Sequence, residues 1–164
     1  MSDVKNGLLE SLVKIAVEDP NSANGRFCIE QFAAELSRRA IAGFDPSTVI
    51  AADPRRLTSP HGLFLVATLH GNVIGSAALG FDGSSGATLH RMWVDPSTRG
   101  LGIGKQLIDE IEKKAHDAGF ESIRLETNSA LHEAIALYRR CGYVEINAFS
   151  HDSPADHWFE KRLI

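Results

Sequence analysis

The pattern of apolar and polar residues along the chain predicts a series of short strands. From residue 12 to residue 18 the large apolar side chains occupy every second position, which is typical of a strand, although a short helix also fits. Two apolar segments, GLFLVATLH and VIGSAALGF, flank a Gly-Asn pair and predict a β-hairpin over residues 63–81. Four further strands are expected over residues 87–94, 122–127, 143–146 and 156–163.

Helices are predicted where apolar residues recur every three or four positions, and a glycine closely follows each predicted helix. In the first, Cys28, Phe32 and Leu36 mark the apolar face. Residues 45–60 contain three prolines and are expected to be irregular. The helices are expected over residues 27–41, 104–118 and 130–141.

The order of these elements indicates the fold class. Alternating strands and helices in the middle of the chain imply some parallel pairing through right-handed crossovers, whereas the hairpins imply antiparallel pairing. We therefore predict one α/β domain over residues 1–164, of mixed α+β type. Its sheet is expected to be twisted and mostly antiparallel, with about seven strands and with helices on both faces.

Composition and charge exclude several classes of protein without naming a function. A chain of 164 residues fits one domain with a sizeable core, and its net charge of −4 argues against a nucleic-acid partner or an anionic membrane surface. No apolar run approaches the roughly 20 residues that span a bilayer, and the N-terminal MSDVKNGLLE lacks the pattern of a signal peptide. Cys28 and Cys141 form no CxxC pair, so a cytoplasmic, reducing location is expected. The seven histidines show no metal-ligand spacing, so no metal is expected.

The stretch STRGLGIGKQL, from Ser97 to Leu107, places glycines and positive charge at the start of a predicted helix. Its spacing does not fit a P-loop, and Lys105 occupies the position of the third glycine in a dinucleotide-binding fingerprint. Acidic residues are normally favoured at a helix N-terminus, yet Arg99 and Lys105 stand here instead. An anion held by backbone N–H groups would resolve this conflict, and a plain loop with solvated charges is the alternative.

This stretch and its surroundings resemble a known family. R-G-L-G-I-G is similar to the R/Q-x-x-G-x-G/A signature of the GCN5-related N-acetyltransferases, and MWVDP precedes it as the expected strand. LETN and ALYRRCGY resemble the family's next strand and helix, so the likeness is greatest over residues 87–143 and reaches the first 60 residues only in general layout. The resemblance implies the acyl-CoA N-acyltransferase fold, with acetyl-coenzyme A lying where the fourth and fifth strands splay apart.

The resemblance also implies which residues hold this cofactor. Backbone amides over residues 99–105 would bind its pyrophosphate, and the free strand edge at residues 92–94 would pair with its pantetheine arm. Asn128 would contact the cofactor directly or through water, or would serve only as a turn or helix cap. The implied cofactor-binding residues are Met92, Trp93, Val94, Arg99, Gly100, Leu101, Gly102, Ile103, Gly104, Lys105, Asn128 and Tyr138.

Acetyl transfer to an amine needs an acid for the departing thiolate and a way to remove a proton from the amine. Tyr138, in ALYRRCGY, matches the family's tyrosine and is the candidate acid, although it also fits the apolar face of its helix. His90 and Glu126 are the candidate bases, and an amine that arrives deprotonated would need neither. Cys141 could instead carry the acetyl group covalently, but its spacing shows no acid–base partner, so direct transfer is preferred.

The predicted function is therefore transfer of an acetyl group from acetyl-coenzyme A directly to a primary amine of a small molecule. The alternatives are a non-catalytic acyl-CoA sensor and an enzyme that acetylates a protein N-terminus or lysine. The acceptor is expected to meet the first 60 residues, where Glu35 or Arg38 could touch it. Dimers are common in this family, so a homodimer is left open, whereas no nucleic-acid or membrane partner is expected.

Overall fold

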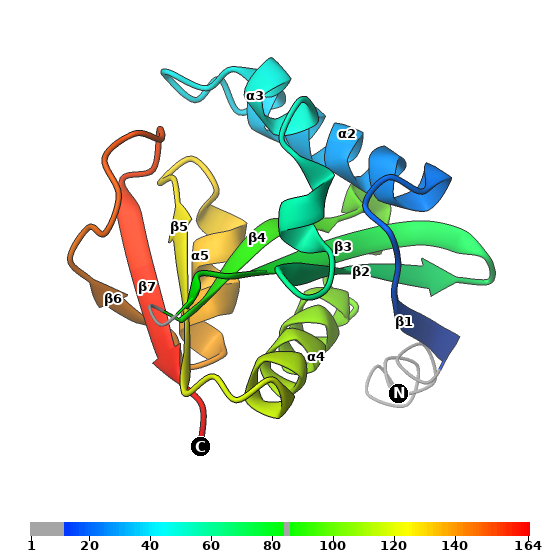
Figure 1. The fold of residues 1–164 in the computed structure, drawn as a ribbon. Coiled ribbons are helices and arrows are strands. Elements are labelled where there is room, and N and C mark those ends of the chain that lie inside the picture. Colours follow the sequence, from blue (N-terminus) through cyan, green and yellow to red (C-terminus); the bar gives the residue numbers. More distant parts are fainter. Residues whose placement is uncertain (1–11, 84–85) are drawn as a thin grey trace.

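The computed structural model describes residues 12–83 and 86–164, which contain a seven-stranded sheet with helices against both of its faces (Figure 1). The N-terminal segment in which no signal peptide is expected lies outside the described residues. The strands are β1 (Val13–Val17), β2 (Gly62–Leu69), β3 (Asn72–Phe81), β4 (Ala87–Val94), β5 (Ser122–Thr127), β6 (Val144–Ile146) and β7 (His157–Arg162). They lie in the order β1-β2-β3-β4-β5-β7-β6, and every pair is antiparallel except β4 with β5. The predicted mixed, mostly antiparallel fold is confirmed.

The three predicted helices are α2 (Ala23–Arg38), α4 (Ile103–Asp117) and α5 (His132–Arg140). Residues 45–60, expected to be irregular, also contain a short helix α3 (Pro46–Ile50) and a 3₁₀ turn over Pro54–Leu57. Each begins after an aspartate, because the carboxylates of Asp45 and Asp53 accept hydrogen bonds from the backbone N–H two residues ahead. The following proline fits the first helical position, so these prolines begin structure rather than break it. None of the helices in the described part of the chain is long and apolar enough to cross a bilayer.

Alternate residues of each strand pack on opposite faces of the sheet. On β2, Leu65 and Ala67 belong to the larger core, which α4 and α5 cover, whereas Phe64 and Val66 belong to a smaller core under α2. Successive strand residues point to opposite faces, so one apolar strand supplies both cores. The larger core is centred on α4, whose Leu107 is fully buried.

A bulge at Arg91 interrupts this alternation in β4. Leu89 packs in the core beneath α4, whereas Trp93, four residues later, packs in the core beneath α2. The register against β3 shifts at this point, and Arg91 adopts a left-handed φ of 53°. The Ser76 hydroxyl of β3 donates a hydrogen bond of 2.9 Å to the Arg91 carbonyl and so holds the bulge in place. The bulge therefore exchanges the faces to which the last residues of β4 point.

The strands β4 and β5 separate soon after they begin. They pair at only two positions, Ala87 with Ile123 and Thr88 with Arg124. Figure 1 shows the two strands diverging beyond these pairs. The splay implied by the family resemblance is therefore present, and residues 89–94 of β4 have no strand partner on the β5 side among the described residues.

Truncation of Leu107 tests whether the core beneath α4 holds the fold. Because this side chain is fully buried, Leu107→Ala is expected to lower the free energy of unfolding by about 2–5 kcal/mol, through lost burial and a residual cavity. Urea denaturation followed by circular dichroism measures the change. Ile50→Ala, at a side chain that is 55% exposed, is the control and is expected to cost about 0.5 kcal/mol or less. Equal losses in the two variants would contradict this account of the core.

Candidate functional site

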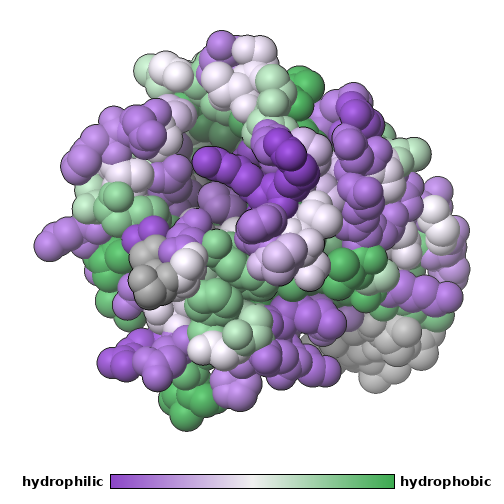
Figure 2. All heavy atoms as spheres, in the orientation of Figure 1, coloured by the Kyte–Doolittle hydropathy of each residue, from purple (hydrophilic) through white to green (hydrophobic). Residues whose placement is uncertain are grey.

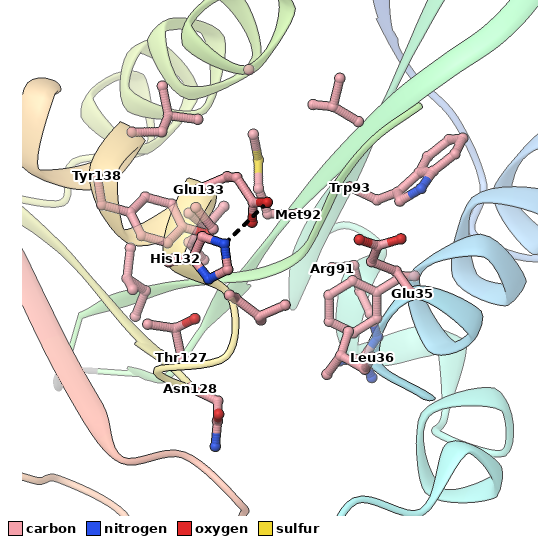
Figure 3. Close-up of a pocket in the computed structure, with 18 of the residues that line it drawn as sticks. Glu35, Leu36, Arg91, Met92, Trp93, Thr127, Asn128, His132, Glu133 and Tyr138 are labelled. Atoms are coloured by element: carbon pink, nitrogen blue, oxygen red, sulfur yellow. Dashed lines mark ion pairs between the residues drawn. The ribbon is translucent and has the colours of Figure 1, made fainter. Parts of the chain in front are cut away.

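A cavity of about 1130 Å³ opens where β4 and β5 separate (Figure 3). Its walls come from β4, β5, α5, the loop that leads into α4, and the segment from α2 through α3. Figure 2 shows that this face of the molecule is hollowed near its middle, with hydrophilic side chains around the opening. Tyr138, His90 and Glu126 all line the cavity, as does every predicted cofactor-binding residue except Leu101.

The loop that begins α4 presents backbone N–H groups at one end of the cavity. A 3₁₀ turn over Pro96–Thr98 leads into Gly100 and Gly102, which adopt left-handed conformations with φ of 82° and 83°. Gly102 is the N-cap of α4, so the helix has no side-chain cap, and its first turn contains no acidic residue. The first N–H groups of α4 can therefore bind an anion.

Gly104 differs from the other two glycines of this loop. It lies inside α4 with ordinary helical conformation, and a Cβ at this position would lie 2.7 Å from Cδ2 of Leu137 on α5. That distance is shorter than any normal carbon contact, so Gly104 leaves room for the end of the Leu137 side chain. The sequence predicts that all three glycines open the backbone to an anion, and at Gly104 the absence of a side chain also makes room for Leu137.

Both basic side chains of the loop have partners within the protein. The Arg99 guanidinium lies 3.2 Å from a carboxylate oxygen of Glu35, and Lys105 Nζ lies 2.8 Å from the carboxylate of Asp109, one helical turn ahead. Neither pair is part of the prediction from the sequence. The Lys105–Asp109 spacing of four residues could have indicated that pair, whereas nothing in the sequence indicates the contact of Arg99 with α2.

Glu35 of α2 joins three arginines at the rim of the cavity. Its carboxylate accepts hydrogen bonds from Arg38, Arg39 and Arg99, and its side chain is only 12% exposed. Burial alone would raise the pKa of Glu35, but the hydrogen bonds from Arg38 and Arg39 and the charge of Arg99 outweigh it and hold the pKa below its ordinary 4.5. At neutral pH the Glu35 carboxylate is therefore ionised and hydrogen-bonded to arginines of the protein. It is poorly suited to the substrate contact that the sequence suggested.

Arg39 extends this network across the cavity to α5. Its guanidinium lies 3.0 Å from the Glu133 carboxylate and donates a hydrogen bond of 3.3 Å to the Ala130 carbonyl. Sequence reasoning did not single out Glu133, although an acidic residue in the first turn of a helix was a usable signal. The result is that α2 is tied both to the glycine loop and to α5.

Tyr138 projects from α5 into the gap between β4 and β5 (Figure 3). Its side chain is 5% exposed and packs near the rings of Tyr143 and Phe159, at centroid distances of 6.0 and 6.4 Å. Burial, with a smaller contribution from Cys141, raises the pKa of Tyr138 well above its ordinary 10. Tyr138 is thus both a core residue and a neutral hydroxyl at the cavity wall.

His90 lies on the α2 face of β4, opposite Ala78 of β3, which packs in the core beneath α2. A Cβ at Gly80 would lie 3.1 Å from Nε2 of His90, so the glycine makes room for the imidazole. Burial, assisted by the charge of Arg91, lowers the pKa of His90 from 6.5 to about 4. The imidazole is therefore neutral at physiological pH.

The carboxylate of Glu126 is held by the segment that leads into β7. It accepts a hydrogen bond from the Ser150 hydroxyl, whose oxygen in turn accepts one of 3.1 Å from the indole N–H of Trp158. No hydrogen bond joins Glu126 to His90 or to Tyr138 among the described residues, so the three candidate catalytic groups line one cavity without forming a triad. Ser150 carried no signal in the sequence.

Asn128 uses both ends of its amide to hold the turn after β5. Its Nδ2 donates a hydrogen bond of 2.8 Å to the Pro154 carbonyl, and its Oδ1 accepts one of 2.9 Å from the Ala130 N–H. Of the two roles considered, these contacts support the turn and cap. Across residues 12–83 and 86–164 there is also no group of three or more His, Cys, Asp or Glu side chains placed to hold a metal ion.

Comparisons with known proteins agree with this geometry. The model of the Acetyltransferase (GNAT) family matches residues 29–143. An IAA acetyltransferase from Azospirillum brasilense is 37% identical over 103 residues, which are 62% of this chain and 67% of that protein. Among solved structures, a GNAT-family acetyltransferase from Staphylococcus aureus Mu50 has a TM-score of 0.78 at 19% identity, covering 93% of this chain and 99% of the other. An aminoglycoside 6'-N-acetyltransferase complexed with coenzyme A has a TM-score of 0.68 at 18% identity, covering 92% and 97% of the two chains.

The network around Glu35 can be tested by removing its charge. Glu35→Gln leaves three arginines without their carboxylate, so we expect the free energy of unfolding at pH 7 to fall by about 1–3 kcal/mol. Because the pKa of Glu35 is lowered by folding, this contribution is present above pH 4.5 and is lost as the pH falls through the folded-state value. Urea titrations at several pH values should therefore show wild type and variant converging in acid. Glu30→Gln, at an exposed position of the same helix, is expected to change little.

Proposed function

The chain belongs to the acetyltransferase (GNAT) family, whose acetyl donor is acetyl-coenzyme A, and we propose that it transfers the acetyl group directly to a primary amine of a small molecule. The observation that carries the proposal is one continuous cavity that joins the uncapped start of α4 to the buried Tyr138. A small-molecule acceptor is supported by the name of the 37% identical relative, an IAA acetyltransferase. Both cysteines in the structure are free, which supports the proposed cytoplasmic location.

The residues of the cavity fit acetyl-coenzyme A. The N–H groups at the start of α4, assisted by the charges of Arg99 and Lys105, would hold the pyrophosphate. The backbone of residues 92–94 has no strand partner on its β5 side and would pair with the amides of the pantetheine arm. When bound, the cofactor supplies the acetyl group as a thioester.

Tyr138 is proposed to stabilise the sulfur that leaves. A thiol has a pKa of about 8.5, and the pKa of the buried Tyr138 lies above the ordinary 10 of tyrosine. Full proton transfer from this hydroxyl to a thiolate is therefore uphill, whereas donation of a hydrogen bond needs no ionisation. We infer that Tyr138 acts mainly as a hydrogen-bond donor to the departing sulfur.

His90 is proposed as the group that relays the proton from the amine. It is neutral at physiological pH and lies on the α2 side of β4, whereas Glu126 is already bound by Ser150. An imidazole with a pKa of about 4 is a weak base, so it can pass a proton to water but does not retain it. The amine's own ionisation is then expected to dominate the pH dependence of the rate.

One experiment separates this proposal from its alternatives. The protein is incubated with acetyl-coenzyme A and a panel of small amines, protein N-terminal peptides and lysine peptides, and the release of free thiol is followed. Turnover on small amines supports the proposal, whereas turnover on the peptides alone would assign a protein substrate. Thermal stabilisation by acetyl-coenzyme A without turnover on any acceptor would indicate a sensor.

The proposed pyrophosphate site can be tested at Gly100. An alanine at this left-handed position is strained and places a methyl group at the uncapped helix start. We expect Gly100→Ala to raise the dissociation constant of acetyl-coenzyme A about tenfold, measured by isothermal titration calorimetry. Gly119→Ala is a matched control, because Gly119 has a φ of 91° with equally open space at the other end of α4. The same loss of affinity in both variants would indicate a general effect of strain and count against the site.

The role of Tyr138 can be tested by removing its hydroxyl. Tyr138→Phe is expected to lower kcat about 10²-fold or more while the affinity for acetyl-coenzyme A stays within about twofold. Stopped-flow thiol release and calorimetry measure the two quantities. Tyr143→Phe is the matched control, because its hydroxyl bonds Glu112 outside the cavity and its removal should leave kcat unchanged. A Tyr138→Phe enzyme with full activity would refute the assignment.

A further inference from the structure

Arg91 is a cation at the cavity wall with no carboxylate partner among the described residues. The two other arginines on this side of the cavity, Arg39 and Arg99, are both paired with Glu35. The guanidinium of Arg91 instead lies over the ring of Phe32, 5.8 Å from its centroid. Loss of contact with water lowers the pKa of Arg91, and no neighbouring carboxylate offsets this effect. A partly buried charge of this kind is a strong site for an anionic group of a ligand.

The backbone directs Arg91 into this position at a cost. A left-handed φ is uncommon for any residue other than glycine, and a backbone held in this conformation is strained. Bulges next to functional sites serve to re-aim a side chain. Figure 3 shows Arg91 on the same side of the cavity as Glu35 and Leu36 of α2, opposite Tyr138. It therefore lies on the α2 side of the cavity, against Phe32, rather than on the α5 side with Tyr138.

The remaining surface around Arg91 is apolar, and two of the three acidic residues that line the cavity are paired with arginines. Glu35 binds three arginines, Glu133 binds Arg39, and Glu126 accepts the hydrogen bond of Ser150. An acceptor with several positive charges would meet Glu126 as the one carboxylate of the cavity without a basic partner among the described residues, and would be repelled by Arg91. The apolar residues that line this side of the cavity are Phe32, Leu36, Ile41, Phe44 and Val49.

On the basis of the proposed acetyltransferase function, we propose that the acceptor is an amine that also carries a carboxylate and an apolar side chain, as an apolar amino acid does. Arg91 binds the carboxylate, and the apolar wall formed by α2 and α3 packs against the side chain. A guanidinium matches a carboxylate with two parallel hydrogen bonds, so it fixes the orientation of the acceptor as well as its charge. The amine is then the remaining polar group and is free to face His90, the neighbouring residue on β4.

The proposal is tested with leucine, with two analogues that lack its carboxylate, and with a polyamine. We compare kcat/KM for leucine, leucinamide, isoamylamine and spermidine in the wild type and in Arg91→Gln, both saturated with acetyl-coenzyme A. The wild type is expected to have a kcat/KM about 10- to 100-fold higher for leucine than for isoamylamine. Isoamylamine has no carboxylate and so cannot form the charged hydrogen bonds with Arg91. In Arg91→Gln this preference is expected to fall below about threefold through a higher KM for leucine, with the rate on isoamylamine retained. Arg26→Gln, on the exposed face of α2 outside the cavity, should keep the wild-type preference.

Two further measurements keep this inference separate from the proposed function. Calorimetry with acetyl-coenzyme A shows whether Arg91→Gln is folded, because the cofactor site does not include this side chain. Calorimetry with leucine on protein saturated with coenzyme A shows binding without requiring turnover. If no amine is acetylated but leucine still binds the wild type and not Arg91→Gln, the proposed function fails and the carboxylate site stands. A wild type that prefers isoamylamine or spermidine, or an Arg91→Gln protein that keeps the preference for leucine, would overturn the inference.

Discussion

The site depends on one departure from a regular sheet, the separation of β4 from β5 after two residue pairs. A sheet that splits in its middle leaves unpaired edges and would ordinarily lose its core along the gap. Here β5 is paired with β7 instead, and α4 and α5 pack against strands on both sides of the gap, so one core extends from Leu79 on β3 to Phe159 on β7. The missing hydrogen bonds are confined to the backbone that faces the cavity. A ligand with its own amides could supply them, as proposed for the pantetheine arm of the cofactor.

The opposite side of the cavity is held mainly by charge. Arg99 and Arg39 connect α2 to the glycine loop and to α5, and both meet at Glu35, whose side chain is 12% exposed while that of Arg39 is 22% exposed. Exposed ion pairs contribute little to stability, but pairs that share a nearly buried carboxylate keep their strength because water screens them less. The network also pairs Glu35 and Glu133, two of the three acidic residues that line the cavity, whereas five arginines and lysines line it. The charge that remains for a ligand is therefore positive, although the chain as a whole has a net charge of −4.

The sequence predicted those features that depend on local periodicity or on a short motif. Seven strands, three helices and the glycine loop are encoded by residues within a few positions of one another, and the resemblance added the splay. The structure differs from the prediction where residues in contact are far apart in the sequence, or where two local signals favour different structures. Residues 45–60, with three prolines, are expected to be irregular, although a proline that follows an N-cap such as Asp45 begins a helix. The contact of Arg99 with Glu35 spans 64 positions, and no periodicity reports such a pair.

The bulge at Arg91 shows the same limit, and it also gives the two sides of β4 different chemical groups. Within ATLHRMWV nothing marks a change of face, because a bulge inserts one residue without altering composition. Its effect is that Trp93 packs beneath α2 while Met92 and Val94 pack on the side of α4. The strand thus presents an unpaired backbone edge to β5 and a charged side chain to α2. The cofactor would be bound by backbone groups, and the acceptor by side chains of β4, α2 and α3. Substitutions within residues 27–50 would therefore alter which acceptor binds without disturbing the site of the acetyl donor.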